Sequence, residues 1–247
     1  MDSNGMSDLA EIPIELIAAG MGATIIEKPL LNADGRIVFG NNKAIITINS
    51  KIEYPEKKRF TLAHEIGHLI MHKDHFLHHN DTDATLEYFK KGNQESEAND
   101  FASELLMPEK LFKEVSDQYE FSPQLLRFLA EQFKTSITSV VYRYFKVGHH
   151  PICIVYSYAN KVKYWMRPDS YDHFMKNCTN LNLPSDSVAA EFYSKNKIYS
   201  KKESKQSIWK STWFELKKGE NDIDFKFYEY CIVTPKYNTA LSVIWED

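Results

Sequence analysis

Hydrophobic residues recur every three to four positions over much of residues 11–146, which is the spacing of one face of an α-helix. This pattern predicts helices over residues 11–22, 56–72, 94–106, 123–133 and 136–146. Residues 36–40 and 44–49 alternate instead around an Asn-Asn pair, which predicts a β-hairpin. Residues 73–93 are polar and show no period, so we expect a loop or a short irregular helix there.

The pattern changes after His150-Pro151. The run PICIVYSYANKVKYWM alternates and turns at Ala159-Asn160, which predicts a second hairpin. Aromatic and β-branched runs predict further strands near residues 207–216, 224–234 and 239–245.

These elements predict an α+β fold in three parts. We expect a mainly helical core with a small β-hairpin or sheet, then a helix-turn-helix-like segment, then a β-rich C-terminal sensor or docking domain. The expected bounds are residues 1–120, 121–149 and 150–247. A hydrophobic content of 43% and a charged content of 26% are ordinary for a globular protein of this size.

The cysteines and the N-terminus favour the cytoplasm. Cys153, Cys178 and Cys231 are few, odd in number and widely spaced, so no disulfide framework is expected. The opening MDSNGMSDLAEIP lacks the basic start and apolar core of a signal peptide. No apolar run approaches the length that spans a bilayer. We therefore expect a soluble cytoplasmic protein with no membrane partner.

The net charge of −4 hides an asymmetry between the two halves of the chain. Residues 1–120 carry 12 Lys and Arg against 21 Asp and Glu, a net of −9, and residues 121–247 carry 18 against 13, a net of +5. Residues 132–168 contain no acidic residue. This stretch is the expected docking surface for an acidic partner, through Arg143, Lys146, Lys161 and Lys163. The alternative is a chance bias on a solvated face.

The stretch FTLAHEIGHLIMH, residues 60–72, carries the strongest chemical signal. His64 and His68 are four residues apart, so on a helix their rings lie on the same face, with Glu65 beside them. In this HExxH pattern the two histidines bind zinc and the glutamate acts as general base. The residue frequencies of the chain give the pattern by chance with odds of about 3%. Gly67 is expected to leave room beside the ion. The alternative is a pair of core histidines that bind no metal.

A third ligand is expected from NQESEANDFASELLMP, residues 93–108, which holds two candidate glutamates. Glu95 shares its helix face with apolar residues three, seven and ten positions on, whereas Glu97 falls on the polar face. Helical phase therefore favours Glu95. Asn99, one turn beyond Glu95, is placed to hydrogen-bond a ligand imidazole from behind. The alternative is that Glu95 only complements the helix dipole.

The motif RFTLAHEIGHLIMH and the later ESEANDFASELLMP together resemble the ImmA/IrrE family of zinc metallopeptidases. The stretch IPIELIAAGMG, the hairpin that ends in ITIN, the segment LLRFLAEQFKTSITSVVYRY and the closing LSVIWED are also similar to that family. The resemblance covers most of the chain and is strongest over residues 36–108.

The resemblance implies a gluzincin-like site in which His64, His68 and Glu95 bind zinc and Glu65 is the general base. Manganese is the alternative ion where its supply favours it. His72 matches a histidine that continues the family signature. We expect it to contact the metal ligands rather than the ion itself, or to have a structural role. The resemblance further implies an endopeptidase that cleaves a helix-turn-helix repressor, because characterised members cut repressors of stress-response or mobile-element genes.

Two rival functions stay open, and with them direct binding to nucleic acid. One is a metal-sensing DNA-binding regulator with residues 123–146 as a true helix-turn-helix. Against it, SITSVVYRYFK offers few side chains that read base edges, and the chain is acidic overall. The other is an inactive peptidase fold used as a binding module, which Glu65 disfavours because ligation alone does not require it. His75, His78 and His79 are expected to be solvated loop residues rather than a lid that supplies metal.

Overall fold

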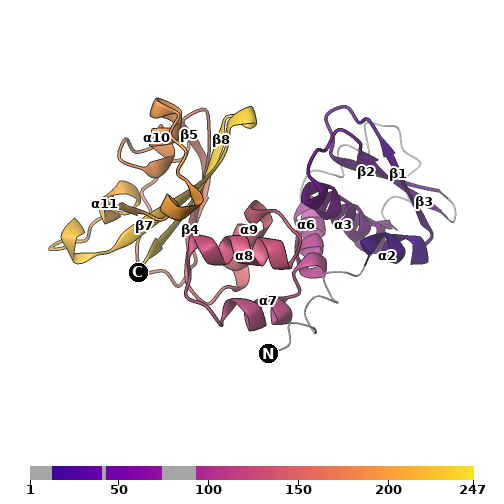
Figure 1. Cartoon of the computed structure of the whole chain (residues 1–247), viewed down its shortest axis with the longest axis horizontal. Coiled ribbons are helices and arrows are strands. Elements are labelled where there is room, and N and C mark those ends of the chain that lie inside the picture. The colour runs from indigo at the N-terminus through magenta and orange to yellow at the C-terminus, as the bar shows by residue number, and fades with distance from the viewer. Residues whose placement is uncertain (1–12, 41–42, 74–92) are drawn as a thin grey trace. The chain divides into compact units, whose positions relative to one another are not determined.

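The computed structural model describes residues 13–40, 43–73 and 93–247 and has the α+β fold that the sequence predicted (Figure 1). The chain forms two compact units, of which the first comprises Met1–Phe112 with Leu129–Ser139 and the second Lys113–Phe128 with Val140–Asp247. The predicted domain bounds at residues 120 and 149 stay a prediction. The loop expected at 73–93 lies outside the described residues except at its two ends, and so do His75, His78 and His79.

The first unit contains a three-stranded sheet in the order β1-β3-β2. Its strands are β1 (Ala23–Lys28), β2 (Gly35–Phe39) and β3 (Ala44–Asn49). The antiparallel pair β2 and β3 is the predicted hairpin, with Ile37 opposite Ile46. β1 was not predicted, and it pairs in parallel with β3. Ile37, Ile46 and Ile48 are buried, so the sheet has one apolar face to cover.

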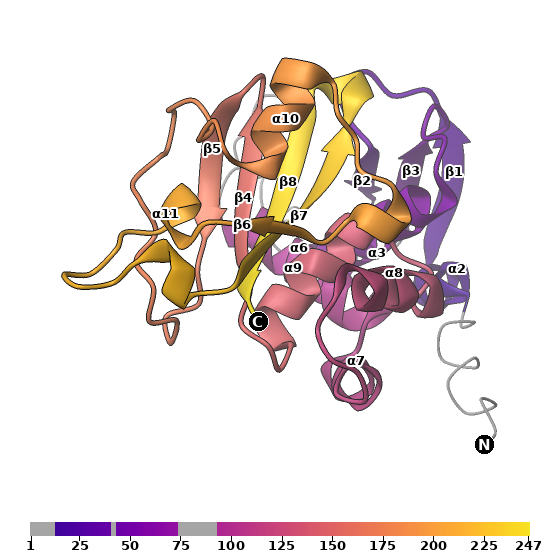
Figure 2. The ribbon, with the colours of Figure 1, turned by 60° about the vertical axis from the view of Figure 1, so that its left-hand side comes forward.

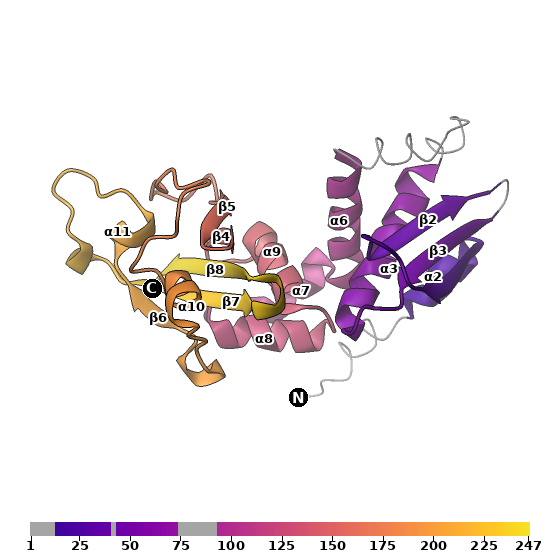
Figure 3. The ribbon, with the colours of Figure 1, turned by 90° about the horizontal axis from the view of Figure 1, so that it is seen from above.

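Helix α3 covers this sheet and also packs along α6 (Figure 3). The helices of the first unit are α2 (Ile14–Gly20), α3 (Pro55–Met71) and α6 (Asn93–Leu106). Gly67 lies where α3 and α6 approach closely, because a Cβ atom there would be 3.2 Å from the Cα atom of Ala98. The expectation that Gly67 leaves room for an ion was therefore wrong, since the space that it leaves is filled by α6.

Three helices each contribute residues to both units: α7 (Glu109–Ser116), α8 (Pro123–Gln132) and α9 (Ile137–Val147). The predicted helices α8 and α9 are present, and α7 was not predicted. α8 begins after Ser122, whose hydroxyl oxygen accepts a hydrogen bond from the backbone N–H of Leu125 at 3.1 Å. α9 buries Val140, Val141, Tyr144 and also Arg143, which is only 6% exposed. Arg143 was thus wrongly expected on a docking surface, whereas Lys146, Lys161 and Lys163 are exposed.

The second unit is built on a five-stranded antiparallel sheet in the order β5-β4-β8-β7-β6 (Figure 2). Its strands are β4 (Cys153–Tyr158), β5 (Lys161–Met166), β6 (Gln206–Ile208), β7 (Phe227–Thr234) and β8 (Thr239–Glu246). The predicted hairpin is β4 with β5, and it turns at Ala159 and Asn160, which have φ angles of 49° and 62°.

Helix α10 (Val188–Lys195) packs against β7 and β8, and α11 (Lys210–Trp213) precedes the buried Phe214. The strand expected at 207–216 is wrong beyond Ile208, because the chain turns into α11 there. Short 3₁₀ turns complete the unit at Lys201–Glu203, Asp222–Asp224 and Pro235–Tyr237. Within the described part of the chain, no helix is both long and apolar enough to cross a membrane.

Candidate metal centre

Helix α3 brings two histidine rings onto one face. Pro55 at its first position and Glu56 in its first turn favour the start of the helix, and burial of Leu62 and Ile66 holds it in place. His64 and His68 stand one turn apart, and their Nε2 atoms are 3.0 Å from each other. The side chain of His68 is only 1% exposed, so the ring can hardly reorient.

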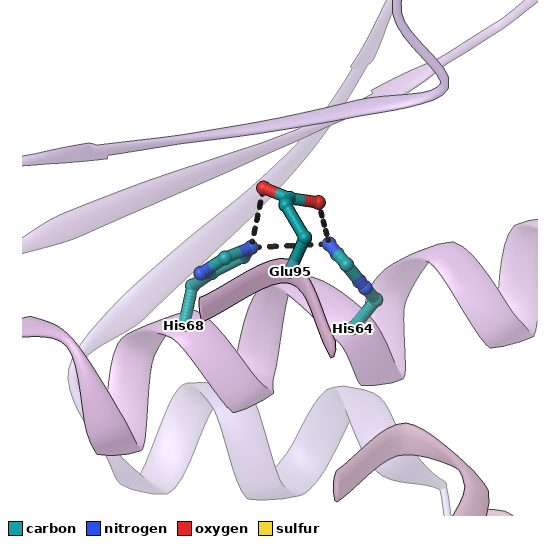
Figure 4. A group of neighbouring side chains, drawn as sticks. All are labelled: His64, His68 and Glu95. Atoms are coloured by element: carbon teal, nitrogen blue, oxygen red, sulfur yellow. Dashed lines mark hydrogen bonds and ion pairs between the residues drawn. The ribbon is translucent and has the colours of Figure 1, made fainter. Parts of the chain in front are cut away.

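Glu95 reaches both rings from the first turn of α6 (Figure 4). One carboxylate oxygen, Oε2, lies 3.3 Å from His64 Nε2, and the other, Oε1, lies 3.3 Å from His68 Nε2. A tetrahedral zinc ion with bonds of about 2.0–2.1 Å separates its ligand atoms by about 3.3–3.4 Å. The Nε2–Nε2 and the nearest nitrogen–oxygen separations are thus close to those of such a site, with a different oxygen of Glu95 facing each ring. One ligand atom from each side chain lies within 4.8 Å of the other two, and these three residues are the one group of this kind among the described residues.

The charges of the cluster favour a cation between the three side chains. Burial raises the pKa of Glu95, but hydrogen bonds from His64 and His68 outweigh it and hold that pKa far below its usual range. Burial lowers the pKa of His64, yet the hydrogen bond to Glu95 and the charges of Glu65 and Glu95 bring it above its ordinary value. Both shifts have the same origin, which is a carboxylate held against two imidazoles. A bound divalent ion would satisfy the same negative potential.

The outer nitrogens of both rings have partners of their own. His64 Nδ1 lies 3.0 Å from Oδ1 of Asn99, and His68 Nδ1 lies 2.9 Å from Nδ1 of His72. Asn99 thus contacts the outer nitrogen of His64, and His72 contacts that of His68. With Nδ1 engaged, each ring is left with Nε2 to offer to an ion.

Glu65 lies against β2 of the sheet. It is only 3% exposed, and a Cβ atom added at Gly35 of β2 would lie 2.6 Å from its Oε1 atom. The carboxylate therefore occupies space that only a glycine leaves open. Its charge nevertheless acts on the ring of His64. A carboxyl group buried beside candidate metal ligands is a candidate general base.

Glu97 has a contact that the sequence argument missed. It lies on the exposed side of α6, as predicted, with 56% of its side chain exposed. Its Oε2 atom is nevertheless 2.9 Å from Nε2 of His72. The pairing of HExxH with a histidine four residues on could have pointed to this contact, because a buried imidazole needs a partner for each nitrogen.

The remaining described histidines belong to the second unit and have other partners. Nδ1 of His149 lies 3.1 Å from Oδ1 of Asp117, and Nε2 of His150 lies 3.0 Å from the backbone oxygen of Glu246. Nε2 of His173 lies 2.8 Å from Oε2 of Glu246. Each of these three rings thus has one nitrogen in contact with an oxygen, and Nδ1 of His173 is buried without a hydrogen-bond partner among the described residues.

Two histidines one helical turn apart, a glutamate next to the first, and a second glutamate from a later helix as third candidate ligand are together the arrangement of HExxH metallopeptidases. A family model described as the IrrE N-terminal-like domain matches residues 18–145, a range that contains the whole cluster. The chain belongs to this family of peptidases, the ImmA/IrrE family, as its motifs predicted.

Two relatives share the match, both described as radiation response metalloprotease IrrE. The protein from Deinococcus radiodurans is 32% identical over 142 residues, which are 58% of this chain and 42% of that one. The protein from Deinococcus deserti is 33% identical over 127 residues, which are 49% of this chain and 42% of that one. The chain thus aligns with less than half the length of either relative.

A solved structure extends the likeness of fold to the whole chain. A Mycobacterium tuberculosis transcriptional regulator superposes with a TM-score of 0.58 over 100% of this chain and 72% of its own. The two sequences are 13% identical, so this match concerns the fold alone.

Proposed function

We propose that this protein is a zinc-dependent endopeptidase of the gluzincin type. The observation that carries the proposal is the convergence of His64, His68 and Glu95, with one ligand atom from each within 4.8 Å of the others, next to the buried Glu65. Membership of the family supports a metal-dependent peptidase, and two imidazoles with one carboxylate are a ligand set that zinc favours. Manganese is the alternative ion.

In the proposed mechanism, His64, His68 and Glu95 hold the ion. A zinc ion bound there supplies Lewis acidity, which polarises a carbonyl group and lowers the pKa of water. Glu65 takes the proton of the attacking water and passes it to the leaving amine as the peptide bond breaks. Such positioned acid–base catalysis contributes roughly 10²–10⁴-fold in rate. The burial of Glu65 favours this role, because the packing around it restricts where the carboxylate can point.

The proposed substrate is a helix-turn-helix repressor in the cytoplasm, whose cleavage relieves repression in a stress or mobile-element response. This part rests on the family resemblance, and the names of the two relatives, which describe a radiation response, agree with a stress role. The rival DNA-binding regulator is less well supported. α9, the helix that would read bases, buries Val140, Val141 and Tyr144 in the protein interior.

The test is to incubate the purified chain with helix-turn-helix repressors encoded near its gene, with and without a chelator. We expect one repressor to be cut at a defined bond, the chelator to abolish the cut, and added zinc to restore it. Cleavage that persists after the metal has been removed would contradict the proposal.

A further inference from the structure

A chain of hydrogen bonds leads from the metal centre to the protein surface. It begins at His68 Nδ1, which lies 2.9 Å from His72 Nδ1, and it continues from His72 Nε2 over 2.9 Å to Oε2 of Glu97. The side chains of His68 and His72 are 1% and 3% exposed, whereas that of Glu97 is 56% exposed. Two buried rings thus connect a surface carboxylate to a proposed ligand.

Only one order of protons along this chain leaves both rings neutral and gives each contact a single donor. The carboxylate of Glu97 can only accept, so His72 carries its proton on Nε2 and donates there. Nδ1 of His72 is then an acceptor, and His68 must donate from its own Nδ1. The lone pair of His68 therefore lies on Nε2, which is the atom that faces His64 and Glu95.

The other ring reaches the same state by a separate route. Oδ1 of Asn99 is an acceptor 3.0 Å from His64 Nδ1, so that nitrogen donates and the lone pair again lies on Nε2. Two nitrogen lone pairs then face each other across 3.0 Å, with the carboxylate of Glu95 3.3 Å from each. Three electron-pair donors so close together repel one another unless a cation lies between them, which is either a metal ion or, without one, a proton that an Nε2 atom donates to Glu95.

We infer that Glu97 is a positioning residue of the metal centre, which fixes the tautomer and orientation of His68 through His72. The inference rests on the proposed function in one respect, namely that a divalent cation binds at His64, His68 and Glu95. Outer partners of metal-binding imidazoles are worth about 10–100-fold in metal affinity. Glu97 acts through two rings rather than by contact with the ion.

The first measurement is zinc affinity by competition with a chromogenic chelator, on the full chain. Glu97→Ala should weaken binding by about 10–100-fold. Glu97→Gln should lie between it and the parent, because the amide oxygen still accepts from His72 but carries no full charge. Glu131→Ala removes an exposed carboxylate elsewhere in the first unit and is the control, with parental affinity expected.

The second measurement reads the tautomers directly, by nitrogen NMR of the histidine side chains in the zinc-loaded protein. We expect the proton on Nε2 of His72 and on Nδ1 of both His64 and His68. A purely structural role for Glu97 does not require this pattern. Loss of the His72 pattern in Glu97→Ala, with the fold retained, would support the inference further.

Different results would contradict the role of Glu97 and the proposed metal centre. If the parent binds zinc tightly and Glu97→Ala binds it equally well, or if His72 carries its proton on Nδ1, the role of Glu97 is wrong and the proposed function stands. If the parent binds no divalent ion, the metal centre itself is wrong and the role of Glu97 falls with it.

Discussion

Four residues along an α-helix make a little more than one turn, so His64 and His68 lie one above the other on α3. That regularity, and the same reasoning for Glu95 on α6, could be read from the sequence. The contacts of His72 with Glu97 and of Glu65 with Gly35 could not, because they depend on how α3 packs against α6 and β2. Local periodicity predicts the face of a helix on which a side chain lies, whereas tertiary packing determines which residues of other elements it contacts.

Glu95 and Glu97 should differ sharply as metal ligands. Glu95→Ala removes a side chain that contacts both ligand rings, so we expect nearly all bound zinc to be lost. Glu97→Ala removes only an outer support and should leave most of the zinc in place when zinc is in excess. Elemental analysis after reconstitution measures both contents, and equal losses would refute the assignment by helical phase.

Gly35 should prove essential for placing Glu65. In Gly35→Ala the new methyl carbon would lie 2.6 Å from Glu65 Oε1 and 2.6 Å from Cγ2 of Thr61. We expect overpacking to cost about 1–3 kcal/mol in the free energy of unfolding. Cleavage should fall while zinc content stays parental, because the carboxylate shifts but the ligands do not.

Gly20→Ala is the matched control for this change, since a Cβ atom at Gly20 meets no heavy atom within 4 Å. It should leave stability and cleavage at parental values. Parental cleavage by Gly35→Ala would mean that Glu65 does not need the place it occupies beside β2.

At the scale of elements, the sequence predicted those whose signals are local and missed those defined by distant partners. The β2–β3 and β4–β5 hairpins carry their own turns, and α3 and α6 carry a clear period. β1 has no turn to β3 and depends on parallel pairing. The aromatic run after Ile208 favoured a strand by composition, but the chain turns there to bury Trp213 and Phe214.

Helix α10 was not predicted, and part of what stabilises it comes from residues far away in the sequence. The backbone N–H groups of Val188 and Ala189 donate to the carboxylate of Glu229 at 3.0 and 3.2 Å, from about forty residues away. Trp213 Nε1 also donates to it, at 3.1 Å, and so does the hydroxyl of Ser242. A buried carboxylate on β7 therefore accepts from the first two N–H groups of this helix, in addition to the local N-cap at Ser187.

Glu229→Ala should accordingly destabilise the second unit. The change leaves four buried donors without their acceptor, and each such group costs about 1–3 kcal/mol. We expect a loss of more than about 3 kcal/mol in the free energy of unfolding, measured by chemical denaturation with fluorescence of the tryptophans. Glu215→Ala, at an exposed position, should change little. A variant at Glu229 that unfolds at the parental denaturant concentration would show that the carboxylate is dispensable.

At the scale of the molecule, selectivity for one repressor cannot come from the metal centre, because the chemistry is the same for any peptide bond. It requires a docking surface, and the acid-free stretch 132–168 stays the predicted one, without the buried Arg143. In this stretch Lys161 pairs across the hairpin with Tyr158, and Nζ of Lys163 lies 5.5 Å from the centre of that tyrosine ring. Exposed lysines beside an exposed aromatic ring suit an acidic partner surface.

Reversal of Lys146, Lys161 and Lys163 to Glu should slow cleavage of the cognate repressor and leave zinc content unchanged. Raised salt should slow the parent in the same way, since exposed charges act mainly on the rate of encounter and are screened. Reversal of Lys202, Lys217 and Lys218 makes the same change in net charge at other exposed positions and should have little effect. If the first variant cleaves at the parental rate but has lost affinity for DNA, the stretch serves nucleic acid instead.

We propose that this chain cleaves peptide bonds with Glu65 as the base beside a metal held by His64, His68 and Glu95. The most direct test compares the parent with Glu65→Gln at matched zinc content, on a repressor that the parent cuts. We expect Glu65→Gln to bind zinc as the parent does and to cleave roughly 10²–10⁴-fold more slowly. Cleavage at the parental rate by the zinc-loaded variant would contradict the claim.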